Sequence, residues 1–172
     1  QSLQDTLIFG LKGIAAYAYH AGELGQRDEE VDAFMHEAMF STLTNVDFDL
    51  NRYLELCLKA GEMNLRVMKM LNDAHTSRFG NPTPATVPTG TKAGPGIVVT
   101  GHDLLDLYEL LKQTEGKGIN IYTHGEMLPA HGYPELRKFK HLVGNYGTAW
   151  QNQKKEFDEF SGAILVTTNC IM

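Results

Sequence analysis

Apolar residues recur every three or four positions through the first part of the chain, which is the spacing of one face of an α-helix. A first stripe predicts a helix over residues 2–24 and comprises Leu3, Leu7, Leu11, Ile14 and Ala18. A second predicts a helix over about 28–41 and comprises Val31, Phe34, Met35, Ala38 and Met39. A third helix is expected to begin at Asp47 or Asp49 and to end near Ala74. Its apolar side is expected to comprise Leu50, Tyr53, Leu54, Cys57, Leu58, Gly61, Leu65 and Met68. Short loops join these segments, so we expect a three-helix antiparallel bundle.

From residue 96 onward the pattern changes to short β-branched runs bounded by glycine and polar residues, which are typical of strands. These runs occupy residues 96–101, 119–123, 163–169 and, more weakly, 141–143. Helical patterns stand between them, and we expect Pro134 and Thr148 to begin two of those helices. A parallel return needs a crossover of about a dozen or more residues. We therefore expect a parallel, Rossmann-like α/β half in which all strands end at one edge.

The segment between the two patterns is dense in proline, glycine and threonine, a composition that interrupts both helices and strands. It begins with Asn81-Pro82-Thr83-Pro84 and continues to Pro95. The sequence therefore predicts a helical bundle over 1–80, a linker over 81–95 and an α/β half-domain over 96–172.

Composition and charge argue against nucleic-acid and membrane partners. The chain of 172 residues is 42% hydrophobic and 21% charged, which is typical of a globular protein. A formal net charge of −6 argues against a nucleic-acid partner, which would select an excess of clustered lysine and arginine. No apolar stretch approaches the roughly 20 residues that span a bilayer, so we expect no membrane partner and a cytoplasmic location. The chain starts with Gln1 and stops directly after an apolar run, so we expect a segment of a longer polypeptide.

Three of the predicted strands are each followed by a residue able to bind a metal: His102, Glu126 and Cys170. If the strands are parallel, these residues follow the same edge of the sheet, where open α/β sheets bind ligands. An imidazole, a carboxylate and a thiolate together suit iron or zinc, although zinc commonly uses close cysteine pairs that this chain lacks. Nucleophilic catalysis by Cys170, with His102 as base and Glu126 as its orienting partner, is an alternative that the residues leave open.

The other candidate ligands have simpler explanations. Cys57 lies on the apolar stripe of the third helix, so we predict an inert core thiol and a reactive Cys170. The methionines of the helical part are interpreted as core residues rather than a copper(I) site; these are Met35, Met39, Met63, Met68 and Met70. Three histidines near helix ends or on polar faces are expected to have no catalytic role: His20, His36 and His75.

A resemblance to the hybrid cluster proteins, also called prismane proteins or hydroxylamine reductases, extends over essentially the whole chain. Its main block is GHDLLDLYELLKQTEGKGINIYTHGEMLPAHGYPELRKFKHLVGNYGTAWQNQ, followed by a strand that ends in TTNC. Two further matches are GEMN at Gly61–Asn64 and NPTP at Asn81. Nickel-iron carbon monoxide dehydrogenase is a more distant relative with a similar architecture, but the HGEMLPAHGYPEL block does not resemble that branch.

The resemblance implies a hybrid iron-sulfur-oxygen cluster that reduces hydroxylamine to ammonia and, in a newer view of the family, nitric oxide to nitrous oxide. By motif, three ligands of that cluster correspond to His102 of GHD, Glu126 of HGE and Cys170 of TNC. Neighbours of these ligands are expected to act at most indirectly, and they are Asp103, His124 and Asn169.

The chain lacks several parts that the resemblance implies for a complete enzyme. Family members carry four cysteines near the amino end for a cubane cluster, and further cluster ligands in a later α/β domain. We therefore expect a segment that supplies part of a site, is inactive alone, and works in its parent with an electron-donor protein. If the chain is instead complete, the alternative is a non-catalytic helical plus α/β module that binds a partner through its bundle.

Overall fold

The computed structural model describes residues 1–43 and 46–168. The chain forms two compact units, one comprising Gln1–His75 and the other extending from Thr76 onward. We describe each unit by itself. In the part of the chain that the structure describes, no helix is long and apolar enough to cross a membrane.

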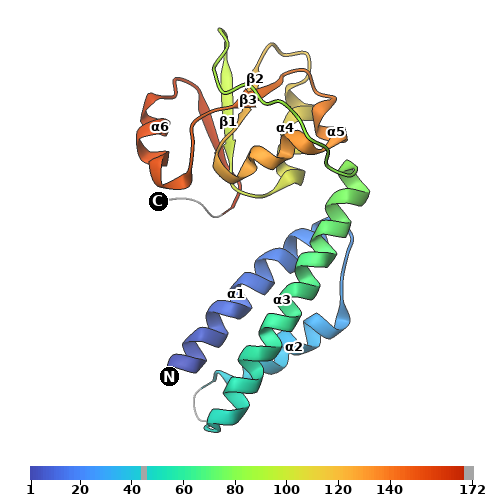
Figure 1. Ribbon diagram of the computed structural model, residues 1–172, viewed down its shortest axis with the longest axis vertical. Helices are drawn as coiled ribbons and strands as arrows, with labels where there is room; N and C mark the ends of the chain where they lie inside the picture. The colour runs from blue at the N-terminus through green and yellow to red at the C-terminus, as the bar shows by residue number, and fades with distance from the viewer. Residues whose placement is uncertain (44–45, 169–172) are drawn as a thin grey trace. The chain divides into compact units, whose positions relative to one another are not determined.

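The first unit is helical. Its elements are α1 (Ser2–Glu23), α2 (Glu29–Ser41) and α3 (Leu50–Phe79). The chain reverses direction between α1 and α2 and again between α2 and α3, as the blue to green ribbons show (Figure 1). The predicted helical part is confirmed. Each helix contributes one face to a single apolar core, which contains Leu7, Leu11, Ile14, Val31, Phe34, Ala38, Tyr53, Leu56, Ala60, Met63 and Val67.

The predicted apolar side of α3 is wrong for most of its members. The exposed ones are Leu50, Leu54, Leu58, Gly61, Leu65 and Met68. The buried face is instead formed by Tyr53, Leu56, Ala60, Met63 and Val67. α3 carries two apolar stripes with similar spacing, and periodicity alone does not tell which stripe the other helices cover.

The predictions for the sulfur-containing residues of the bundle are confirmed for some residues and wrong for others. Cys57 is half-buried against the core, with its thiol 3.5 Å from the carbonyl oxygen of Leu3. The interpretation of the methionines as core residues holds for Met63, which is buried, and for Met35 and Met70, which pack against the core. It is wrong for Met39 and Met68, which are exposed.

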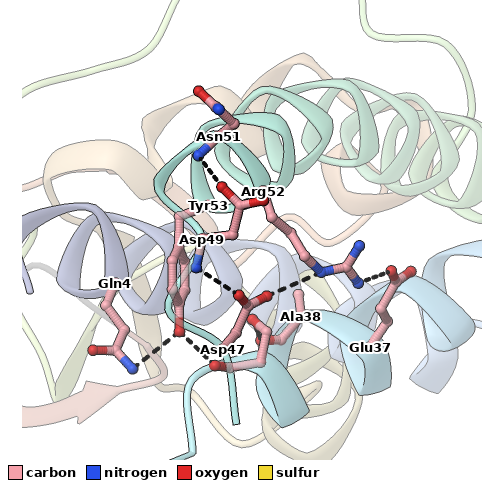
Figure 2. Close-up of polar contacts among 9 residues, drawn as sticks. Gln4, Glu37, Ala38, Asp47, Asp49, Asn51, Arg52 and Tyr53 are labelled. Carbon is pink, nitrogen blue, oxygen red and sulfur yellow. Dashed lines mark hydrogen bonds and ion pairs between the residues drawn. The ribbon is translucent and has the colours of Figure 1, made fainter. Parts of the chain in front are cut away.

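Tyr53 joins the three helices at one end of the bundle. Its hydroxyl donates a hydrogen bond of 2.5 Å to the carbonyl oxygen of Ser41, at the end of α2. The same hydroxyl accepts a bond of 3.2 Å from the side-chain amide of Gln4, in α1 (Figure 2). The Tyr53 side chain is buried, and its hydroxyl bonds to both α1 and α2. These contacts fix the start of α3 relative to the other two helices.

Two aspartates prepare the start of α3, as predicted. Asp49 accepts a hydrogen bond of 2.9 Å from the backbone N–H of Asn51, the bond expected of a helix cap. Asp47 accepts one of 2.9 Å from the backbone N–H of Asp49 and pairs with Arg52 at 3.0 Å. Arg52 reaches on to Glu37 of α2 at 2.8 Å (Figure 2).

The second unit contains a four-stranded sheet of β1 (Gly96–Thr100), β2 (Asn120–Thr123), β3 (Leu142–Asn145) and β4 (Ala163–Val166). The strand order is β3-β2-β1-β4 and every pairing is parallel. The predicted parallel α/β arrangement is therefore confirmed. β1 has partners on both sides, and its Val98 and Val99 are fully buried.

The helical segments of this unit are α4 (Leu104–Thr114), η1 (Gly125–Gly132), α5 (Pro134–Arg137), η2 (Trp150–Asn152) and α6 (Gln153–Glu159). Pro134 begins α5 as predicted. Thr148 does not cap the last helix, because the 3₁₀ turn η2 intervenes and Asn152 takes the position before α6. The Thr148 hydroxyl instead donates to Glu156 at 2.6 Å.

Residues 81–95 contain neither helix nor strand, and they are hydrogen-bonded along the α/β unit. The backbone N–H of Thr83 donates to Gly132 at 2.9 Å, and the carbonyl oxygen of Pro88 accepts from Asn145 at 2.8 Å. The backbone N–H of Lys92 donates to the hydroxyl of Tyr122 at 2.8 Å. The segment predicted as a linker therefore contacts Gly132 and the strands that contain Tyr122 and Asn145.

A matched pair of leucines tests which face of α3 is the core face. Leu56 is 4% exposed and Leu58 is 67% exposed. We expect Leu56→Ala to lower the free energy of unfolding by about 2–5 kcal/mol, because it leaves a cavity. Leu58→Ala should change it by about 0.5 kcal/mol or less. Urea denaturation followed by circular dichroism measures both, and equal losses would contradict the observed burial.

Candidate metal centre

The candidate site lies where the strand order reverses. β2 follows β1 on one side, and β4 is added on the other side of β1, so the carboxyl ends of β1 and β4 flank a topological switch point. Parallel α/β sheets bind ligands in the crevice at such a point. His102 comes two residues after β1, and Glu126 comes three residues after the adjacent β2. Cys170 lies outside the described residues.

His102 and Glu126 are brought together although they are 24 positions apart in the chain. The Nε2 atom of His102 contacts the Oε2 atom of Glu126. Their side chains are 31% and 59% exposed, so the contact lies at the surface of this unit. An imidazole nitrogen and a carboxylate oxygen therefore meet at one point, each from the end of a different strand.

Thr168 fixes the other nitrogen of the same ring. Its hydroxyl oxygen accepts a bond of 2.7 Å from the backbone N–H of His102. The Nδ1 atom of His102 lies 3.1 Å from that oxygen. When a metal takes the place of the direct Glu126 contact at Nε2, Nδ1 can carry the ring proton and donate it to Thr168, which is the tautomer that an Nε2 metal ligand requires. Sequence reasoning missed Thr168; its place two positions before Cys170 was the available signal.

Gly101 allows the β1 and β4 ends to approach so closely. Its φ is +107°, and a Cβ atom there would lie 2.3 Å from the Thr167 hydroxyl oxygen and 2.6 Å from the Thr168 nitrogen. The Thr167 hydroxyl donates a bond of 3.0 Å to the carbonyl oxygen of Thr100. Glycine at the first position of the GHD motif is therefore needed to bring Thr168 to His102.

Two of the expected indirect partners can be assigned. Asp103 is the N-cap of α4, where it accepts bonds from the backbone N–H groups of Leu105 at 2.9 Å and Asp106 at 3.2 Å. It thereby fixes the start of the helix that follows His102. His124 pairs with Glu156, as described next, and Asn169 lies outside the described residues.

His124 and Glu156 form a second histidine-carboxylate pair. The ring of His124 is fully buried, and its Nε2 atom is 2.7 Å from the Oε2 atom of Glu156. Burial alone would raise the pKa of the Glu156 carboxyl, but hydrogen bonds from Thr148 and His124 together hold that pKa below its ordinary value. The pair therefore contains an ionised carboxylate next to a buried imidazole.

His131 is the third histidine of this part of the sheet. Its Nε2 atom is 3.0 Å from the Thr123 hydroxyl, and the ring is buried. Burial lowers its pKa, so the ring is neutral at pH 7. Its contacts are those of a core histidine.

Comparison with known proteins places the chain in a family. The family model described as "Prismane/CO dehydrogenase family" matches residues 1–172. The chain belongs to the prismane/CO dehydrogenase family. It is 78% identical over 171 residues to the hydroxylamine reductase of Moorella thermoacetica, which covers 99% of the chain and 40% of the relative. It is 64% identical over 170 residues to that of Syntrophobacter fumaroxidans, covering 99% of the chain and 31% of the relative.

The family resemblance expected from the motifs is thus confirmed. A third relative, the hydroxylamine reductase of Thermotoga petrophila, is 58% identical over 170 residues, or 99% of the chain and 39% of the relative. The prismane-family chain therefore spans between about a third and two fifths of the length of these relatives.

Prismane-family proteins carry iron-sulfur clusters. The residues present fit such a group in part, because His102 offers a correctly oriented nitrogen and Glu126 an oxygen at one point. Within residues 1–43 and 46–168, no group of three or more His, Cys, Asp or Glu residues is arranged to hold a metal ion. The described pair therefore offers two donor atoms, fewer than a metal site needs.

The charge of Glu156 gives a pH-dependent prediction. Because its pKa in the folded chain lies below the ordinary 4.5, the ionised carboxylate stabilises the fold above pH 4.5. That contribution is lost as the pH falls through the folded-state pKa. The stability difference between the wild type and Glu156→Gln, which cannot titrate, should therefore shrink on acidification. Urea denaturation followed by the fluorescence of the single tryptophan, Trp150, measures it. A constant or growing difference would contradict the assignment.

Proposed function

We propose that this chain is the part of a hydroxylamine reductase that supplies His102, Glu126 and Cys170 to a hybrid iron-sulfur-oxygen cluster. The observation that carries the proposal is the contact between Nε2 of His102 and Oε2 of Glu126 at the switch point of a parallel sheet. The relatives named hydroxylamine reductase support the activity, which belongs to the longer parent protein. This segment alone is proposed to be inactive.

Each proposed ligand has a distinct chemical role. The imidazole of His102 and the carboxylate of Glu126 are the harder donors, suited to iron atoms that exchange small ligands. The thiolate of Cys170 is the soft donor, suited to the sulfide-bridged side of the cluster. When bound, such a cluster would pass on two electrons from the donor protein, which with two protons convert hydroxylamine to ammonia and water. The task of this chain is to hold its donor atoms in place.

The position of Thr168 supports including Cys170. Thr168 is the last described residue and already contacts His102 through its hydroxyl. Cys170 follows it by two positions, and two residues of extended chain reach at most about 7 Å. The sequence position of Cys170 is therefore the reason for including it in the proposal.

The metal site and the Cys170 nucleophile make different demands on the two nitrogens of His102. A base that activates a thiol uses one ring nitrogen for the thiol and the other for its orienting carboxylate. In the structure Nε2 faces Glu126, while Nδ1 faces the Thr168 hydroxyl. A base for Cys170 with Glu126 as its orienting partner would have to give up the Thr168 bond, whereas a metal held by both His102 and Glu126 would replace only their direct contact, and this favours the metal site.

Other components belong to the proposed parent. They are the remaining ligands of the hybrid cluster, a second cubane iron-sulfur cluster, and a surface for an electron-donor protein. Nitric oxide is the second proposed substrate, reduced to nitrous oxide. The proposed compartment is the cytoplasm, where thiols such as Cys57 and Cys170 stay reduced. We propose no nucleic-acid or membrane partner.

Ligand substitutions in the full-length parent test the proposal. Glu126→Gln keeps the size of the side chain but removes its charge, so it should disturb one iron, whereas Cys170→Ser should cost more of the cluster. Hydroxylamine reduction should fall at least about tenfold in both. Glu135→Gln is the control, because the Glu135 side chain is 42% exposed and its carboxylate pairs with Lys138 at 2.5 Å. Full activity and unchanged iron content in the Glu126 variant would remove that residue from the site.

The two cysteines should differ in reactivity once the cluster is removed. Cys57 is half-buried against the bundle core and should react slowly with alkylating reagents. Cys170, freed from iron, should react quickly. Mass spectrometry of labelled peptides before and after chelation measures both thiols. Equal labelling rates in folded protein would count against the assignment of Cys170.

A further inference from the structure

Buried His124 lies two positions before a proposed ligand, Glu126, and pairs with half-buried Glu156. The proposed ligands do not explain the role of this pair. The backbone N–H of His124 donates to the carbonyl oxygen of Val99 at 2.9 Å, which ties it to β1. Its ring packs edge-on against Phe157, with the ring centroids 4.9 Å apart. Together with the 2.7 Å contact to Glu156, these bonds fix His124 at both its backbone and its side chain.

Glu156 is held just as firmly from the other side. Its carboxylate accepts a bond of 2.6 Å from the Thr148 hydroxyl, and its carbonyl oxygen accepts one of 2.8 Å from the Tyr146 hydroxyl. Gly147, with φ +73°, leaves room for the pair: a Cβ atom there would lie 2.6 Å from Oε2 of Glu156 and 2.7 Å from Cδ2 of His124. The turn after β3 is therefore shaped around this contact.

Only Gly125 separates His124 from Glu126. Its φ is +55°, a conformation that glycine adopts without strain. Because glycine has no side chain, Gly125 itself cannot anchor this turn. His124 before it and Met127 after it are both buried, and the backbone N–H of Met127 donates to His124 at 3.2 Å. The exposed Glu126 thus projects from a tight turn whose fixed point is His124.

We propose that the His124–Glu156 pair positions Glu126, holding the turn at Gly125 so that the Glu126 carboxylate stays at Nε2 of His102. Neither member of the pair touches that contact, so both are positioning residues. The inference rests on the proposed function of Glu126 as a cluster ligand. Partners of this kind commonly change metal affinity or activity by about 10–100-fold when they are lost.

The test uses the full-length parent and the electron paramagnetic resonance spectrum of its cluster, with iron content and activity alongside. Glu156→Ala removes the acceptor and should alter the spectrum in the same way as Glu126→Gln. Activity should fall by at least about tenfold. Glu156→Gln should restore most of the wild-type spectrum, because its amide oxygen still accepts from His124. Glu159→Ala, on the same helix with an exposed carboxylate, is the matched control and should change nothing.

A double variant separates positioning from simple stabilisation. If Glu156 acts through Glu126, then adding Glu156→Ala to Glu126→Gln should cause no further spectral change. A purely structural pair would lower the melting temperature and leave the spectrum of the folded protein unchanged. An unchanged spectrum in Glu156→Ala, or additive changes in the double variant, would overturn the inference.

The outcomes also distinguish this inference from the proposed function. If Glu126→Gln itself leaves the spectrum and iron content unchanged, the proposed ligand role fails and the positioning role fails with it. If only Glu156→Ala is silent, the ligand role stands and the inference falls. Should Glu156→Ala fail to fold, Thr148→Val at an exposed position loosens Glu156 more gently. It should then give a smaller change in the same direction, and no change would overturn the inference.

Discussion

The parallel pairing of β1 with both β2 and β4 is the constraint on which the candidate site depends. Because the strands run the same way, the residues that follow them lie at one edge, and the chain can bring Glu126 and Thr168 to His102 across 24 and 66 positions. Burial of Val98 and Val99 keeps β1 at the centre of that arrangement. A slip of one residue would turn these side chains to the opposite face, so register and site are specified together.

The two nitrogens of His102 have different partners in the candidate site. The bond to Thr168 uses Nδ1, and the contact with Glu126 uses Nε2. Such an arrangement holds the imidazole in one ring orientation at the end of β1, which reduces the cost of forming the site. Gly101 contributes by lacking a side chain, since any Cβ atom would collide with the threonines after β4.

Much of this fold follows from local patterns. β-branched runs and the length of the crossovers predicted a parallel sheet, and apolar spacing predicted the three helices of the bundle. The core face of α3 was not predictable, because Leu58 and Leu56 lie on stripes of similar periodicity and only packing with the other helices selects one. Thr168 and Glu156 were missed for a related reason: threonine and glutamate are common, and their roles arise from contacts over 66 and 32 positions.

The central claim is that Nε2 of His102 binds iron in the parent protein. Electron-nuclear double resonance on protein with ¹⁵N-labelled histidine measures it directly, because a nitrogen bonded to iron shows a strong hyperfine coupling. The account predicts such a coupling in the wild type and its loss in His102→Gln. A spectrum without histidine coupling, or one whose coupling survives in the His102 variant, would contradict the account.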